Sequence, residues 1–131
     1  MPKMKLDAVS VTCTDFAKTV KFYGLLGFSF PQLKAGDKHL EAITAPGEVR
    51  LMIDDADLIQ GITGKAPLPP THSSFAMKCE SPATVDATIA AIRKAGFTVV
   101  KEPWDAFWGQ RYAIASDPEG YMIDLFAALK T

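Results

Sequence analysis

The chain has 131 residues with 48% hydrophobic and 22% charged side chains, a composition that suits one globular domain or two very small halves. Its 14 Lys and Arg nearly balance its 15 Asp and Glu, so the sequence offers no basic surface for nucleic acid or an anionic membrane. The apolar runs are too short to span a bilayer and the N-terminus lacks the apolar segment of a signal peptide, so we expect a cytoplasmic protein.

The first half predicts a strand, a helix and three further strands. Apolar and polar side chains alternate over residues 8–14, which indicates a strand with one buried face. Asp15 can cap the helix that follows, and the spacing of Phe16, Val20 and Tyr23 places one apolar stripe along that helix. Further strands are expected at residues 28–33, 38–45 and 48–54, separated by glycine-containing turns.

The second half predicts the same order of elements. Residues 74–80 alternate in the same way, and a Ser-Pro pair then marks the start of a helix. Val85, Ile89 and Ile92 repeat the apolar stripe of the first helix, and a Gly-Phe pair ends both helices. Further strands are expected at residues 97–101, 110–115 and 121–127.

The two halves therefore form an internal repeat, in which Cys13 of the first strand corresponds to Cys79. We expect an α+β fold of two tandem βαβββ modules, at about residues 4–55 and 72–131, joined by the linker 55–71. A helix covers only one face of such a module, so its other face must be covered by a second module or left as a groove. The long linker allows the modules to pair within one chain or across two chains, and both alternatives stay open.

Four motifs stand in order along the chain: the strand and helix start of residues 6–15, the FYGLLGF helix end of residues 22–28, the WGQR of residues 108–111 and the DPEGYMIDL of residues 117–125. Together they resemble the vicinal-oxygen-chelate superfamily, the glyoxalase, bleomycin-resistance and dioxygenase fold. The resemblance implies a single domain over residues 1–131, in which the modules form a cup-shaped mixed β-sheet with helices on its outer face. It also implies a homodimer, and it leaves the reaction open because one fold serves many functions.

Metal-dependent members of this superfamily hold a divalent ion with one side chain from the first strand and one from the last strand of each module. By resemblance, the first-strand positions fall on Ala8 and Ser74, and the last-strand positions fall on Arg50 and Asp124. Alanine has no ligand atom, a neutral serine is a poor ligand, and a permanent cation repels a metal ion. Because only Asp124 is a plausible ligand, we expect a protein without a metal or other cofactor.

Two further side chains are weak candidates for a metal site. His72 and Glu48 each lie two residues before one of these positions, on the same strand face, and could join Asp124. However, an offset of two residues moves a side chain about 6.5 Å along a strand, more than metal–ligand distances tolerate. We therefore expect His72 to be a surface residue, and we expect His39 to be an exposed strand residue.

Arg50 and Asp124 also suggest a different arrangement. In this resemblance they occupy corresponding places on the two modules and face the same cup. An ion pair between them would satisfy both charges, either as a structural link or as the polar anchor for a ligand. Asp124 is in addition the candidate for a catalytic group, if the protein has one.

An aromatic segment at residues 103–109, with two Trp and one Phe, lies beside the expected cup. Such rings are costly to leave in water, so they either plug the cup or a dimer contact, or form a stacking wall for a flat or apolar ligand. The residues that we expect to bind the ligand are Arg50, Met52, Trp104, Phe107, Trp108, Gln110, Arg111, Asp124 and Phe126.

Three functions remain open. The favoured one is a metal-independent small-molecule binding protein, similar to the drug-sequestering members of the superfamily, which holds an aromatic or apolar drug or metabolite. The second is an enzyme of the same fold, either a metal-dependent lyase, isomerase, thiol transferase or dioxygenase, or a metal-free enzyme with Asp124 or His72 as the general base. The third is a regulatory or interaction module whose own aromatic side chains fill the cup.

Overall fold

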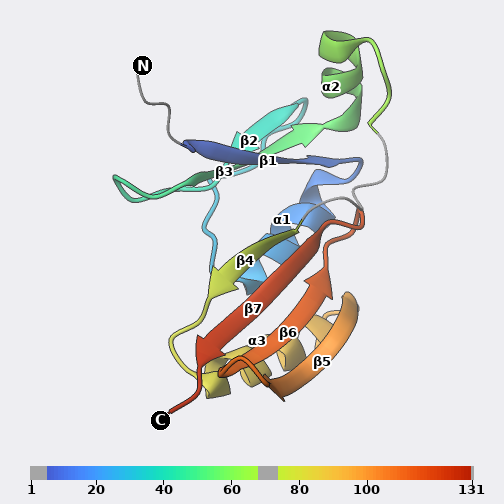
Figure 1. The fold of residues 1–131 in the computed structure, drawn as a ribbon. Helices are drawn as coiled ribbons and strands as arrows, with labels where there is room; N and C mark the ends of the chain where they lie inside the picture. Colours follow the sequence, from blue (N-terminus) through green and yellow to red (C-terminus); the bar gives the residue numbers. More distant parts are fainter. Residues whose placement is uncertain (1–5, 68–73, 131) are drawn as a thin grey trace.

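The computed structural model describes residues 6–67 and 74–130 (Figure 1). In chain order its elements are β1 (Ala8–Cys13), α1 (Phe16–Leu25), β2 (His39–Glu41), β3 (Arg50–Asp55), α2 (Ala56–Thr63), β4 (Ser74–Lys78), α3 (Pro82–Lys94), β5 (Thr98–Ala106), β6 (Gln110–Ser116) and β7 (Met122–Ala128). None of the described helices is long and apolar enough to cross a membrane.

The strands form two mixed sheets, one from each half of the chain. Sheet A has the order β1-β3-β2 and sheet B has the order β4-β7-β6-β5. In both sheets the first strand lies at an edge and runs parallel to the last strand of its module, and the remaining neighbours are antiparallel. The predicted α+β fold with two repeated modules is therefore confirmed.

Sheet A has fewer and shorter strands than predicted. Residues 28–33, where a strand was expected, have no regular secondary structure, and β2 is limited to three residues. Pro31 has no N–H for a ladder, and the Ile43 amide donates a backbone hydrogen bond to the Ser29 carbonyl at 2.8 Å. Phe28 and Phe30 instead pack partly buried against the core, which explains the strand-like apolar pattern.

The linker contains a helix that the sequence analysis missed. Asp55 caps α2 by accepting a hydrogen bond from the Asp57 amide at 2.9 Å, and Gly64 ends α2 with a φ of 80°. Leu58, Ile59 and Ile62 follow helical spacing, but proline and glycine further along the linker hid that pattern. Residues 56–63 of the expected linker are therefore helical.

In the second module the predicted helix is confirmed, and the aromatic segment is a loop only at residues 107–109. Ser81 caps α3 by accepting from the Thr84 amide at 3.3 Å, and the predicted apolar stripe is fully buried. Strand β5 runs on to Ala106 and therefore includes Trp104. Two register shifts, on either side of Lys101, allow β5 to stay paired with β6 over this length.

The two sheets share one hydrophobic core, which lies on their helix-covered faces. Side chains of both sheets meet those of α1 and α3 in a single buried cluster. Tyr23 on α1 donates to the buried Asp117 carboxylate of the second module at 2.9 Å, and the Thr12 amide donates to the Tyr121 hydroxyl at 3.2 Å. In Figure 1, α1 lies below sheet A and behind sheet B. Each sheet therefore turns its uncovered face, here called its open face, toward the outside of the molecule.

Candidate functional site

The open face of sheet B carries a cluster of aromatic rings. Tyr112 and Phe126 lie next to buried residues along β6 and β7, Trp104 on β5 stands opposite Tyr112, and Trp108 follows from the β5–β6 turn. The ring centroids of Tyr112 lie 5.6 Å from Trp104, 5.2 Å from Trp108 and 6.3 Å from Phe126. We call these four residues the aromatic face.

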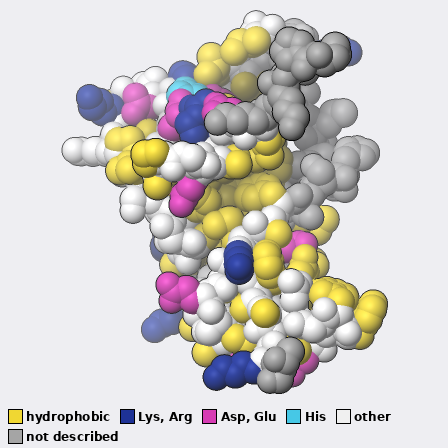
Figure 2. Space-filling model, turned by 60° about the vertical axis from the view of Figure 1, so that its left-hand side comes forward, with side chains coloured by type: hydrophobic (Ala, Val, Ile, Leu, Met, Phe, Trp, Pro, Cys, Tyr) yellow, Lys and Arg dark blue, Asp and Glu magenta, His cyan; other side chains and the backbone are white. Residues whose placement is uncertain are grey.

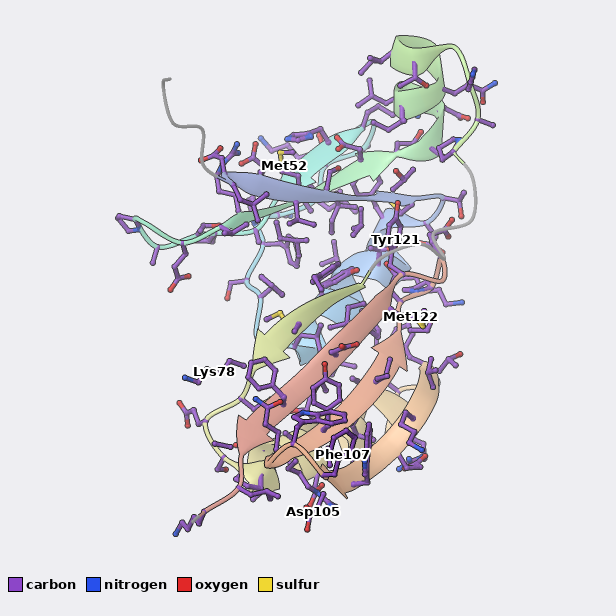
Figure 3. The ribbon with its side chains drawn as sticks, viewed as in Figure 1. Met52, Lys78, Asp105, Phe107, Tyr121 and Met122 are labelled. Carbon is purple, nitrogen blue, oxygen red and sulfur yellow. The ribbon has the colours of Figure 1, made fainter. Side chains whose placement is uncertain are left out.

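The turn between β5 and β6 leaves large apolar side chains in solvent. Trp108 is 48% exposed and Phe107 is 97% exposed. The Trp108 indole N–H donates to the Gln110 side-chain oxygen at 2.8 Å, and its ring meets that of Trp104 edge-on at 5.9 Å. Exposed aromatic area of this kind is typical of a surface that binds a partner or a ligand. Phe107 and Trp108 of this turn and Gln110 at the start of β6, all predicted for ligand binding, thus lie close together, and Figure 3 shows Phe107 at the lower end of sheet B.

A carboxylate contacts one of these rings. Asp124 on β7 accepts a hydrogen bond from the Tyr112 hydroxyl, and its neighbour on β4 is the small Ala76. Burial, and then the hydrogen bond and charge of Asp124, raise the pKa of Tyr112 to about 12. The phenol therefore stays protonated at neutral pH and acts as a donor. Asp124 keeps free acceptor positions, since a carboxylate accepts about four hydrogen bonds.

Arg111 lies on the other side of sheet B, although we predicted it among the ligand-binding residues. Because side chains alternate along a strand, the residue next to Tyr112 points to the helix-covered face. There the Arg111 guanidinium pairs with Asp86 on α3 at 3.0 Å and with Asp105 at 3.1 Å. It contributes to the packing of α3 on the sheet and not to the aromatic face.

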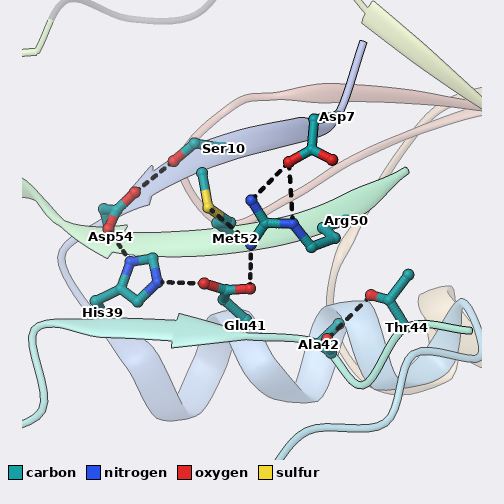
Figure 4. A network of polar contacts seen from close by, with 9 residues as sticks. All are labelled: Asp7, Ser10, His39, Glu41, Ala42, Thr44, Arg50, Met52 and Asp54. Carbon is teal, nitrogen blue, oxygen red and sulfur yellow. Dashed lines mark hydrogen bonds and ion pairs between the residues drawn. The ribbon is translucent and has the colours of Figure 1, made fainter. Parts of the chain in front are cut away.

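The open face of sheet A is polar and holds Arg50 and Met52 (Figure 4). The Arg50 guanidinium pairs with Asp7 at 2.9 Å and with Glu41, and it lies 3.9 Å from the Met52 sulfur. The predicted Arg50–Asp124 pair is not formed, because the two residues lie on different sheets with different partners. Arg50 and Asp124 also do not occupy equivalent positions in the two sheets. Arg50 is paired with Ala8, whereas Ser74, the counterpart of Ala8, is paired with Met122, and Asp124 is paired with Ala76.

The sequence analysis missed the role of His39, which is the centre of a polar chain on sheet A. Its Nδ1 lies 2.5 Å from the carboxylate of Asp54 and its Nε2 lies 3.0 Å from that of Glu41. Asp54 is only 7% exposed and also accepts from the Ser10 hydroxyl at 2.5 Å. The alternation of His39 and Glu41 on one face of β2 was visible in the sequence, but their approach to Asp54 depends on the pairing of β2 with β3.

Hydrogen bonds to Asp54 and then to Glu41 raise the pKa of His39, and the same contact with His39, followed by Arg50, lowers the pKa of Glu41. Because folding raises the imidazole pKa, the charged ring stabilises the folded state fully below about pH 6.5, and this contribution is lost as the pH rises through the raised value. Solvent keeps the contribution small, since the ring is partly exposed.

We expect NMR titration to show His39 titrating above the usual histidine range, and Asp54→Asn to return its pKa toward that range. The His39→Gln variant assigns the signal, because the chain has one other histidine. An unchanged His39 pKa in Asp54→Asn would contradict this account of the contact.

The described residues do not fit a bound metal ion. Ala8 has no ligand atom, Arg50 is a paired cation, and Glu48 is exposed at the rim of a groove between the sheets. Within residues 6–67 and 74–130, no three His, Cys, Asp or Glu side chains are placed to hold a metal. His72 lies outside the described residues. Metal-independence stays a prediction, which elemental analysis of the purified protein tests.

An apolar groove separates the two sheets beside their edge strands β1 and β4. It has a volume of about 330 Å³, and Figure 2 shows it as a hollow with apolar side chains at its base. The apolar residues that line it are Leu6, Val9, Phe28, Val49, Leu51, Phe75, Ala76 and Met77. Most of these residues belong to the helix-covered sides of the sheets, and Arg50 and Ala76, at the margins of the two open faces, also line the groove.

Comparison with known proteins agrees with this fold. A family model described as the Glyoxalase/Bleomycin resistance protein/Dioxygenase superfamily matches residues 5–125, whereas a search of curated proteins found no significant match. Hypothetical protein SA1046 of S. aureus is 18% identical, with a TM-score of 0.80 over 98% of this chain and 96% of that one. A glyoxalase-related enzyme from Fulvimarina pelagi is 14% identical, with a TM-score of 0.82 over 95% and 88%. A glyoxalase/bleomycin resistance protein/dioxygenase from Nocardioides is 22% identical, with a TM-score of 0.74 over 99% and 87%.

Proposed function

Because the chain belongs to the glyoxalase/bleomycin resistance protein/dioxygenase superfamily, we propose that it is a metal-independent protein that binds a flat, aromatic or apolar small molecule. The observation that carries the proposal is the aromatic face. Four rings lie together on the uncovered side of sheet B, and one of them is half exposed. A flat ligand would remove this apolar area from water and stack on the rings at the same time.

We further propose that the ligand site is completed by a second copy of the chain. The open faces of one chain point to different sides of the molecule, and Figure 3 shows Met52 on the side of sheet A that is turned away from sheet B. A cup that holds Arg50 and Met52 together with the aromatic face therefore needs sheet A of one chain and sheet B of its partner. Such an arrangement is a closed twofold dimer with two identical cups.

Three features support this dimer. First, β1 and β4 are edge strands of the described sheets, and edge strands are ready to meet another chain. Second, the apolar groove runs beside both edges and is open to solvent. Third, Leu6, Ile43 and Val49 are exposed around it, so a partner seated there would bury a continuous apolar surface.

Tryptophan fluorescence gives a direct test of ligand binding. The chain has two Trp residues, and both belong to the aromatic face, so the intrinsic signal reports only from the proposed site. We expect a screen of planar aromatic compounds to find ligands that change this fluorescence. Native mass spectrometry of the freshly purified protein shows in addition any small molecule that it carries.

Trp108→Ala should weaken such a ligand about tenfold or more, because aromatic stacking contributes about 1 kcal/mol beyond the buried area. The melting temperature should change little, since Trp108 is half exposed. Ile62→Ala, which removes an exposed apolar side chain of α2, is the matched control and should leave affinity unchanged. A sharp fall in melting temperature with unchanged affinity would show that the turn is structural and does not bind the ligand.

One observation favours a second candidate, a metal-free enzyme. His39 is held by the nearly buried Asp54 on the open face of sheet A, an arrangement that suits a general acid or base once Glu41 moves away. In the proposed dimer this face lies across the cup from the aromatic face. Mass spectrometry of screened ligands after incubation tests it: a product formed by the wild-type protein and lost in His39→Gln would identify an enzyme.

A further inference from the structure

We propose that the ligand of the aromatic face is a planar aromatic cation whose positive charge or charged N–H group is directed at Asp124. This inference rests on the proposed function and names the chemical class of its ligand. It is based on the Asp124 carboxylate, which contacts a ring of the aromatic face and has acceptor positions that the described residues leave free.

The Asp124 carboxylate limits which ligand charge the aromatic face can accept. Asp124 is half-buried on β7 between Ile114 of β6 and Ala76 of β4, and the Tyr112 hydroxyl is its hydrogen-bond donor within the described residues. A flat ligand on these rings would take the remaining water from Asp124. Removing water from a charge is costly unless an opposite charge or a donor replaces it. A neutral ligand would incur this cost, whereas a cation would offset it.

The rings of the aromatic face also favour a cationic ligand. The face of an aromatic ring carries negative potential and attracts cations, most strongly for Trp. The structure already contains one such contact, since the Lys101 ammonium lies 4.9 Å from the centre of the Trp104 ring. Rings and carboxylate therefore favour the same sign of ligand charge. A planar cation satisfies both, because it stacks on a ring and spreads its charge over it.

The two lysines near this face, Lys78 and Lys101, lie at its margins. Lys78 stands opposite Phe126, but Figure 3 shows its side chain extending beyond the edge of sheet B. Lys101 lies on β5, at the other edge of the sheet, against Trp104. Both ammonium groups thus lie at the margins, whereas Asp124 lies on the inner strand β7. An anionic ligand stacked on the central rings would meet Asp124 first.

Three matched probes test the charge preference: acridine, which is neutral at neutral pH, 9-aminoacridine, which is cationic, and acridine-9-carboxylate, which is anionic. Isothermal titration calorimetry should give 9-aminoacridine an affinity at least about tenfold above that of acridine, with acridine-9-carboxylate the weakest. In Asp124→Asn, which keeps an acceptor for Tyr112, the ratio of the first two affinities should fall severalfold, to the smaller preference that the rings alone give. Glu80→Gln makes the same charge change at an exposed position outside the aromatic face and should keep the wild-type ratio.

A second variant keeps the test informative if Asp124→Asn folds poorly. Tyr112→Phe removes the phenol donor and leaves the Asp124 carboxylate in place, so the preference for the cation should persist or increase. Equal affinity of the wild-type protein for acridine and 9-aminoacridine, a preference for the carboxylate, or a ratio unchanged in Asp124→Asn would overturn this inference and leave the proposed function standing. If none of the three probes binds while the fluorescence screen finds another planar ligand, this inference is overturned and the proposed function stands; if the screen also finds none, both fail.

Discussion

Tyr23→Phe should lower the free energy of unfolding by about 1.5–3 kcal/mol, the range for a hydrogen bond to a charged group. Tyr23 is fully buried on α1, and its hydroxyl donates to the carboxylate of Asp117, itself almost fully buried in the turn before β7. Burial raises the pKa of Asp117, and the bond from Tyr23 and the backbone amides of residues 119–121 oppose that rise. Removing the phenol leaves this carboxylate with fewer donors and removes a link between the two modules.

Urea unfolding, followed by circular dichroism, measures this change. Tyr121→Phe is the matched control, because its hydroxyl also joins the modules but accepts from the Thr12 amide and touches no charge. It should cost about 1 kcal/mol, the usual value for a neutral hydrogen bond. Equal losses in the two variants would contradict the importance that we give to the buried Asp117 carboxylate.

Val49→Asp should convert the proposed dimer to monomers. Val49 lines the groove and is 45% exposed in one chain, so aspartate has little effect on the folded monomer. In the dimer the same aspartate would be buried in an apolar contact without a partner, which costs a few kcal/mol. The dissociation constant of the dimer should therefore rise at least about thirtyfold, and ligand affinity should fall with it.

Analytical ultracentrifugation over a range of concentrations measures this effect. Val100→Asp is the matched control, because Val100 is 48% exposed on β5, away from both edge strands of the groove. It should leave the association state unchanged. If wild-type protein and Val49→Asp sediment alike, the groove is not the interface.

Most of the fold follows from local patterns in the sequence. The apolar stripes of α1 and α3 sit at helical spacing and each stripe ends near a capped terminus, so both helices were predicted close to their observed bounds. The repeat of this pattern was enough to predict two modules. The strand expected at residues 28–33 was wrong, because an apolar segment with a proline packs against the core without entering a ladder.

The site was harder to predict because it depends on contacts distant in the sequence. The side-chain alternation of β6 and β7 correctly placed Asp124 and Phe126 on one face, but Arg111 was assigned to that face although it directly precedes Tyr112. The alignment of Arg50 with Asp124 failed by two residues, since a repeat does not fix the register of the last strand. The direction of each open face follows from the packing of the modules around a shared core, which no short motif encodes.

The measurement that tests the central claim most directly is complementation between two damaged chains. Met52→Lys places a positive charge, which repels a cationic ligand, on the open face of sheet A, and Trp108→Ala removes a ring from the aromatic face of sheet B. Each variant alone should bind 9-aminoacridine poorly. After the two are unfolded together and refolded as a mixture, every mixed dimer would hold one cup built from two intact faces. Calorimetry should then recover about a quarter of the wild-type sites at wild-type affinity. If mixing restores no binding, the two faces do not form one site across two chains, and the proposed composite cup is wrong.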